Sequence, residues 1–283
     1  MVLLLGTGIS NLSLPFGSTE AEDHHSSSTE FRTTSGAGPC RSGIVDAHDP
    51  EGYGLPVSTS APRRRGDRSR RLLADLEGLV EARRKKPRDD ILSSMIFAEE
   101  QGQRLTCEEL IATLIFLFSA GHSTTRDLLG SGLVAMLSDR DQYATLVTDP
   151  TLAAAAVEES LRFESPIKML RRRAIADTAI GNTKIAAGES VVAVLLAANR
   201  DPDRFDEPDR FIIDRPDNRP VSIGGDIHHC VGAALARMEA EVVFRALATR
   251  FPHLALTDPR IAWRDTPVFR GLLAVNVSPS FGG

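Results

Sequence analysis

The sequence has few cysteines, no excess of basic residues and no long apolar run. Three cysteines among 283 residues are too few for a disulfide framework, and this low number fits a reducing compartment. The 33 Lys and Arg residues are outnumbered by 38 Asp and Glu, and the net charge of -5 argues against a general nucleic-acid binder. No apolar run reaches the roughly 18 residues of a membrane span, and the start of the chain lacks the features of a signal peptide. We expect a cytoplasmic protein without nucleic-acid or membrane partners.

Residues 1–66 differ in composition from the rest of the chain. Ser, Thr, Gly and Pro are scattered there among isolated apolar residues, without a sustained period of 2 or 3.6. We leave this segment unassigned and expect little packed structure in it. Residues 67–283 form the second region, which opens with leucines at helical spacing.

Helical signals dominate residues 67–283. A capping box, Thr106-Cys-Glu-Glu109, predicts a helix that runs to about Leu137 and is roughly 45 Å long. Because its first half is apolar on all sides, we expect this helix to cross the middle of the domain. Residues 173–194 alternate and turn as short strands do. Further helices are expected over about 89–99, 139–147, 152–163 and 231–251. The fold class is therefore mainly α with a small β part.

The most informative segment is residues 222–232, a glycine-containing loop that presents Cys230 just before a helix. Free N–H groups and the macrodipole at a helix start stabilise a thiolate, so Cys230 is placed to be an anionic ligand or a nucleophile. Gly232 lets a flat group approach the backbone closely. The alternative is a small buried hydrophobe. Zinc needs a second ligand pair, which His228 and His229 do not supply, and a nucleophile needs a base that the sequence does not identify.

Two charged residues on one helix form the second signal. Glu159 and Arg162 are three residues apart, so their side chains share a face and can pair. An exposed helical ion pair explains them equally well. A buried pair would need further partners, and Arg210, in the irregular stretch Pro208-Asp-Arg-Phe211, could supply the missing contact.

Glycine and paired threonines interrupt the apolar helix at residues 120–125. Gly121 costs about 1 kcal/mol relative to Ala within a helix. The Thr124 hydroxyl can bond the carbonyl of Ala120, four residues back, and widen the helix. The alternative is a helix bend without chemistry.

Together, in this order and spacing, these signals resemble the cytochrome P450 family of haem-thiolate monooxygenases, of the soluble bacterial type. The resemblance covers about residues 72–277 and implies the C-terminal portion of the cytochrome P450 fold, a haem-binding region truncated by the missing N-terminal helices. It implies haem b (iron protoporphyrin IX) and electrons that pass from NAD(P)H through a ferredoxin-type partner. The implied reaction inserts one oxygen atom of O2 into a hydrophobic small molecule. The alternatives are a truncated or divergent relative without catalytic activity, and a haem-binding sensor.

The resemblance also assigns roles around the haem. It makes Cys230 the axial thiolate ligand of the iron, a ligand that favours O–O cleavage. Gly224 and Gly232 would belong to the haem-binding loop. His228 and Arg172 would bind the haem propionates.

The same resemblance assigns catalytic roles to the central helix. Thr124 would hold oxygen and relay protons, next to a helix loosened at Ala120 and Gly121. The resemblance further implies a structural triad that locks the haem-binding core without taking part in catalysis: Glu159, Arg162 and Arg210.

The chain departs from the family pattern in three respects. The cysteine loop of the family begins with Phe and has a second Gly four residues before the cysteine, whereas this chain has Ile223 and Asp226. A side chain at 226 is expected to strain the turn, and its carboxylate disfavours a nearby thiolate, so we expect weaker or altered haem binding. Ser123 replaces the usual acidic residue, so a proton relay would depend on Thr124 and water. Residues 1–66 do not resemble the N-terminal helices of the family.

Overall fold

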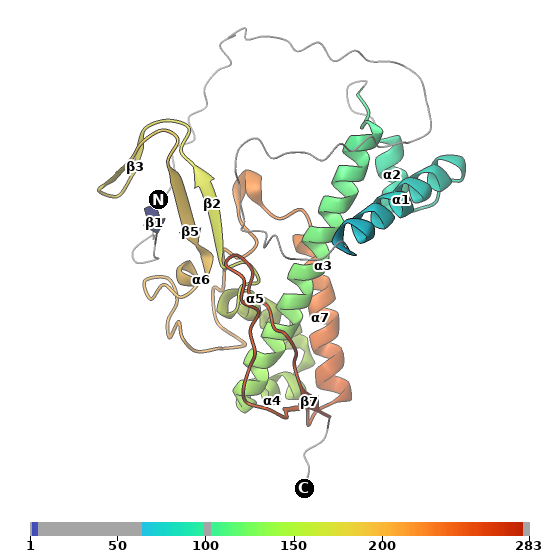
Figure 1. Cartoon of the computed structure of the whole chain (residues 1–283). Coiled ribbons are helices and arrows are strands. Elements are labelled where there is room, and N and C mark those ends of the chain that lie inside the picture. The colour runs from blue at the N-terminus through green and yellow to red at the C-terminus, as the bar shows by residue number, and fades with distance from the viewer. Residues whose placement is uncertain (1, 5–63, 99–102, 280–283) are drawn as a thin grey trace. The chain divides into compact units, whose positions relative to one another are not determined.

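The computed structural model of the chain is shown in Figure 1, and the residues it describes are 2–4, 64–98 and 103–279. The prediction of little packed structure over residues 1–66 lies largely outside these ranges. Within them, Val2–Leu4 form strand β1, which pairs in parallel with strand β5 (Ser190–Val194). The sequence did not predict this strand.

The chain divides into two compact units, and the division falls inside the long helix α3 (Cys107–Ser138). The described part of the unit formed by residues 18–119 contains α1 (Arg64–Lys85), α2 (Ile91–Phe97) and the start of α3. The three helices share a small apolar cluster, whose buried members are Val80, Leu92, Leu110 and Ile111. The predicted helices of this region are therefore confirmed.

Side-chain caps fix where two of these helices begin. The Thr106 backbone N–H donates to Glu109 Oε2 (2.9 Å) and the Glu109 N–H donates to Thr106 Oγ1 (3.2 Å), which is the predicted capping box. At the start of α2, Asp90 accepts from the Ser93 backbone N–H (2.8 Å). This hydrogen bond, with further help from Arg83, lowers the pKa of Asp90 from 3.8 to about 2.

The first half of α3 is not buried on all sides in the part of the chain that the structure describes. Leu110 and Ile111 are buried, but Phe116 and Phe118 are each 66% exposed. The prediction that this segment crosses the middle of a domain is therefore wrong for the described residues. A helix that is apolar on every face can be buried on every face, but the sequence does not show which faces have packing partners. In the described structure only the face of this half of α3 toward the shared cluster is packed against other helices.

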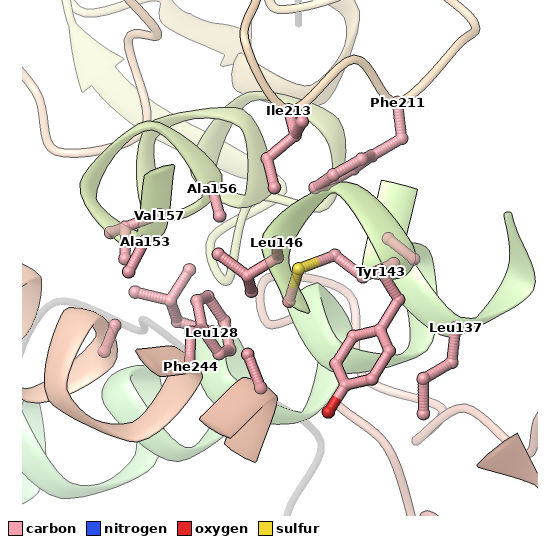
Figure 2. Close-up of a cluster of buried hydrophobic side chains, with 14 of the residues drawn as sticks. Leu128, Leu137, Tyr143, Leu146, Ala153, Ala156, Val157, Phe211, Ile213 and Phe244 are labelled. Carbon is pink, nitrogen blue, oxygen red and sulfur yellow. The ribbon is translucent and has the colours of Figure 1, made fainter. Parts of the chain in front are cut away.

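The second unit, residues 1–17 with 120–283, is built on a helical core. Three helices, α4 (Arg140–Thr148), α5 (Ala153–Phe163) and α7 (Ala233–Arg250), surround the C-terminal half of α3. Figure 2 shows the buried side chains that they share, among them Leu128, Leu137, Tyr143, Leu146, Ala153, Ala156, Val157, Phe211, Ile213 and Phe244. This single apolar cluster supports the elements that carry the candidate site.

Close packing in this core depends on a glycine of α3. A Cβ at Gly132 would lie 2.8 Å from the Phe244 ring of α7 and 2.5 Å from Ser160 Oγ of α5. No side chain fits at that distance, so Gly132 is required where the three helices approach one another.

The β part is small. In the main sheet the strand order is β1-β5-β2, with β2 (Met169–Arg173) antiparallel to β5. The other strands form two short antiparallel pairs: β3 (Thr178–Ile180) with β4 (Thr183–Ile185), and β6 (Ala255–Leu256) with β7 (Val277–Ser278). The predicted fold class, mainly α with a small β part, is confirmed. In the ranges that are described, no helix has the length and apolarity that crossing a membrane requires.

Two short helical segments, η1 (Pro150–Leu152) and α6 (Leu195–Ala198), connect these elements, and a third, η2 (Asp226–His228), lies in the loop before α7.

Candidate functional site

The loop that carries Cys230 is anchored to α5 at its start. Ser222 is buried, and its Oγ donates to the Leu161 carbonyl (2.5 Å) and accepts from Asn199 Nδ2 (2.7 Å). Asn199, which is also buried, accepts at Oδ1 from the Val221 backbone N–H (2.9 Å). Buried and mutually satisfied hydrogen bonds therefore fix the position of the loop.

Two residues with positive φ shape the turn. Gly224 has φ +71°, and a Cβ there would lie 2.7 Å from the His228 carbonyl oxygen, so no side chain fits. Asp226 has φ +54°, in the left-handed region that L-residues rarely adopt. The expectation that a side chain at position 226 strains the turn is confirmed. The Cys230 N–H donates to the Ile223 carbonyl (2.9 Å) and closes the loop.

The Cys230 thiol is free and exposed, just before the N-terminus of α7. Two apolar side chains on either side are also exposed, Ile227 at 79% and Val231 at 88%. A Cβ at Gly232 would lie 3.9 Å from Cys230 Sγ, an ordinary contact, so the protein's own packing does not require glycine there. The sulfur is therefore open to a ligand and lies next to two exposed apolar side chains.

A cation, Arg237, lies near the start of α7. Arg237 Nε donates to Glu158 Oε1 of α5 (2.5 Å), and this hydrogen bond raises the pKa of Arg237. The charge of Cys230 makes a smaller contribution in the same direction, which places positive charge near the sulfur.

Glu159 and Arg162 form a buried network rather than an exposed ion pair. Both side chains are fully buried, and Arg162 binds Glu159 through two hydrogen bonds of 2.7 and 2.8 Å. Arg162 NH1 also donates to the Asn199 carbonyl (3.0 Å). The same Asn199 holds Ser222, so a continuous chain of hydrogen bonds joins the charge pair to the cysteine loop.

The third member of this network is Arg215, not Arg210. Arg215 Nε lies 3.1 and 3.2 Å from the two Glu159 carboxylate oxygens, and its side chain is 3% exposed. The Arg210 side chain is 60% exposed and binds Glu207 (2.5 Å), and only the Arg210 backbone carbonyl accepts from Arg162 and Arg215. This corrects the predicted triad.

Sequence reasoning also missed Asn218, whose Nδ2 donates to Glu159 Oε2 (2.9 Å). Both missed residues follow the buried apolar run of Phe211 and Ile213. The sequence signal for this network is an arginine and an asparagine within five residues of a buried apolar run. A buried carboxylate needs hydrogen-bond donors, and a segment that is itself buried can bring them.

Thr124 makes the hydrogen bond that the sequence predicts. Its Oγ1 donates to the Ala120 carbonyl (2.6 Å). The helix nevertheless continues as an α-helix through Ala120 and Gly121, so the expected widening is not seen. A Cβ at Gly121 would meet no atom within 4 Å among the described residues.

The two candidate propionate ligands are exposed cations or potential cations on separate elements. Arg172 lies on β2, and its NH1 donates to the Arg171 carbonyl (3.0 Å). His228 ends η2 in the cysteine loop. No hydrogen bond joins these two side chains within the described residues.

The family relationship follows from sequence comparison. The sequence profile of the family described as "Cytochrome P450" matches residues 67–266. The chain belongs to the cytochrome P450 family.

Individual P450 relatives agree with this. The chain is 41% identical over 226 residues to cytochrome P450 107B1 of Saccharopolyspora erythraea, which covers 79% of this chain and 56% of the relative. It is 42% identical over 205 residues to the polyketide biosynthesis cytochrome P450 PksS of Bacillus subtilis. This match covers 71% of this chain and 51% of PksS. The solved structure of the ligand-free P450 monooxygenase TamI has a TM-score of 0.73 at 40% identity, over 79% of this chain and 56% of that one. The chain therefore spans about half the length of the curated relatives that it matches.

Cytochromes P450 are haem-iron proteins that use iron protoporphyrin IX, and the residues present here fit that group. Porphyrin nitrogens supply four iron ligands, so the protein needs to offer one soft donor, which the free Cys230 thiol provides. Exposed Ile227 and Val231 offer apolar contact to a macrocycle. No cluster of three or more His, Cys, Asp or Glu side chains suited to a metal ion occurs in the described ranges.

Proposed function

We propose that the chain carries the haem-thiolate centre of a monooxygenase that inserts one oxygen atom of O2 into a hydrophobic small molecule. The observation that carries the proposal is the exposed Cys230 thiol before α7, in a loop tied to the buried Glu159 network. Among the relatives, the vitamin D(3) 25-hydroxylase of Pseudonocardia autotrophica is 42% identical over 207 residues, 72% of this chain and 51% of that protein. A hydroxylase with an apolar substrate supports this reaction class.

Haem, when bound, supplies oxygen activation at the iron, and a thiolate ligand favours O–O cleavage. Cys230 would hold the iron as a thiolate, favoured by the α7 N-terminus and by the nearby Arg237. Exposed Arg172 and His228 would bind the two propionates, because guanidinium and imidazole N–H groups donate hydrogen bonds to carboxylates. Electrons would come from NAD(P)H through a ferredoxin-type donor.

Thr124 is the residue that we propose to relay protons where oxygen binds. Its hydroxyl hydrogen is used in the bond to the Ala120 carbonyl, so Oγ1 is available as an acceptor. It would therefore order a water through an accepted hydrogen bond, and it would donate a proton only after releasing Ala120. Ser123 would give no acidic help, so the water is the proton carrier.

A reconstitution experiment tests this proposal. The full chain is supplied with haem, reduced and exposed to carbon monoxide, and turnover of apolar substrates is measured with a ferredoxin and its reductase. We expect the absorption spectrum of thiolate-ligated haem together with hydroxylated product. A haem complex with this spectrum but no product under any electron supply would overturn the monooxygenase activity, and absence of the spectrum would overturn the haem-thiolate centre.

A further inference from the structure

A cavity of about 410 Å³ lies in the unit that contains residues 120–283, apart from the cysteine loop. None of its lining residues belongs to the loop of residues 222–232, and Thr124 does not line it. Its floor includes buried Ser131 and Ala135 of α3 and buried Phe211, whereas Ser138 and Asp209 at its rim are exposed. The volume lies in the range of small-molecule sites.

A buried hydroxyl at the floor has no partner. Ser131 is fully buried, and its Oγ makes no hydrogen bond among the described residues. A helical serine can satisfy its hydroxyl at the carbonyl four residues back, and Ser131 does not. Because an unpaired buried hydroxyl is unfavourable, this group is available to a ligand that enters the cavity.

The charged residues that line the cavity are three carboxylates, Asp139, Glu164 and Asp209, and two guanidiniums, Arg210 and Arg270. Asp139, at the start of α4, forms no capping hydrogen bond with its side chain and no ion pair among the described residues. It lies close enough to Arg210 to add to the effect of Glu207, which is the main cause of the raised pKa of Arg210. The other two carboxylates of the lining are each paired with a guanidinium, Glu164 with Arg270 and Asp209 with Arg200. Arg210 is itself paired with Glu207.

Three aromatic residues, Phe163, Phe211 and Trp263, are among those that line the cavity. Phe163 and Phe211 pack edge to face with their centroids 5.8 Å apart. The Arg270 guanidinium stacks 3.6 Å from the Trp263 ring centroid and is held there by Glu164. Ser131 and Asp139 are eight residues apart along and just beyond α3, which corresponds to about 12 Å.

We propose that this cavity is a second binding site, which takes an aromatic amine. The ammonium group pairs with Asp139, the aromatic ring lies against Phe163 and Trp263, and a hydroxyl at the far end of the ring bonds Ser131. The proposal does not depend on haem or on monooxygenase activity, because none of these residues belongs to the candidate haem site.

The sequence contains one tryptophan, Trp263, so intrinsic tryptophan fluorescence reports directly on this cavity. The full chain without added haem is titrated with phenethylamine, with neutral 2-phenylethanol and with anionic 3-phenylpropionate. We expect a saturable change with phenethylamine and binding about tenfold weaker for the other two, since only the amine can pair with Asp139. No saturable change with the amine, or equal affinity for the three probes, would overturn the proposal.

Variants separate the two polar contacts. Asp139→Asn should weaken phenethylamine binding about tenfold without unfolding the protein, because the Asp139 side chain makes no capping hydrogen bond in the described structure. Asp177→Asn, an exposed change outside the cavity, is the matched control and should have no effect. By calorimetry, tyramine should bind more tightly than phenethylamine, and Ser131→Ala should abolish that difference. Equal behaviour of the two Asp variants, or an unchanged tyramine advantage in Ser131→Ala, would contradict the assignment.

Discussion

The Glu159 network and the Cys230 loop are opposite in character although a chain of hydrogen bonds joins them. In the network, Glu159 and Arg162 are fully buried, and their hydrogen bonds are made within the protein. In the loop, Cys230 and its apolar neighbours are exposed, and Asp226 has an unfavourable backbone conformation. The buried network is therefore complete without a ligand, whereas the loop leaves the Cys230 sulfur and two apolar side chains available to one.

Breaking the network should have the largest effect on stability. Arg162→Ala leaves the Glu159 carboxylate without its main partner in the interior, and we expect a loss of about 3 to 5 kcal/mol in the free energy of unfolding. Urea unfolding of wild type and variant measures it.

Arg210→Ala is the matched control, because its side chain is 60% exposed and outside the network. It should cost under about 1 kcal/mol, whereas Arg215→Ala should resemble Arg162→Ala. A larger loss of unfolding free energy for Arg210→Ala than for Arg215→Ala would contradict the corrected triad and support the predicted one with Arg210.

The connection between the two regions should have an intermediate effect. Asn199→Ala removes the contacts with Ser222 and Val221 and leaves buried polar groups unpaired, which costs about 1 to 3 kcal/mol. We also expect lower haem affinity, because the loop start is no longer fixed. Haem titration followed by absorption gives the affinity, with exposed Asn276→Ala as the control. Unchanged haem affinity at lowered stability would show that the anchor supports the fold alone.

Relieving the turn should have a smaller effect of opposite sign. Asp226→Gly places glycine at φ +54° and should stabilise the folded chain by about 0.5 to 1 kcal/mol. It also removes a carboxylate near the thiolate, so haem affinity should rise. Parallel haem titrations and melting curves provide the measurement. Equal haem affinity and equal melting temperatures would mean that Asp226 is harmless to the site.

The smallest expected effect on stability is that of Asp90, in the unit of residues 18–119, and it depends on pH. Hydrogen bonds from Ser93 and Arg83 lower the pKa of Asp90 from 3.8 to about 2. Because the folded-state pKa is depressed, the stabilisation by ionised Asp90 is present above pH 3.8 and is lost as pH falls toward 2. Urea midpoints of wild type and Asp90→Asn should converge across that interval. A constant difference between them would contradict the assignment.

Local signals predicted more of this molecule than contacts between distant segments did. The capping box at Thr106 and the hydroxyl bond of Thr124 connect residues three or four apart, and both are present. The β1–β5 pairing and the Arg215–Glu159 contact join residues far apart in sequence, and no periodicity reports such contacts. The motif around Arg210 indicated the correct segment, but burial of the adjacent run selects Arg215 as the side chain that turns inward.

The candidate site shows the same limit. The position of Cys230 before a helix follows from the glycines and the helix pattern after them. The anchoring of the loop through Asn199 and Ser222 does not, because an asparagine and a serine in irregular segments carry no local signal for a buried hydrogen bond.

The proposal that Cys230 ligates haem iron is tested most directly by the carbon monoxide spectrum of the reduced, haem-supplied chain. The spectrum is recorded for wild type, Cys230→Ser and Cys107→Ser. Cys230 is free and exposed before α7, whereas Cys107 begins α3. We expect the spectrum of thiolate-ligated haem for wild type and Cys107→Ser, and its loss in Cys230→Ser with the melting temperature unchanged. A thiolate spectrum that survives in Cys230→Ser, or that disappears in Cys107→Ser, would contradict the proposal.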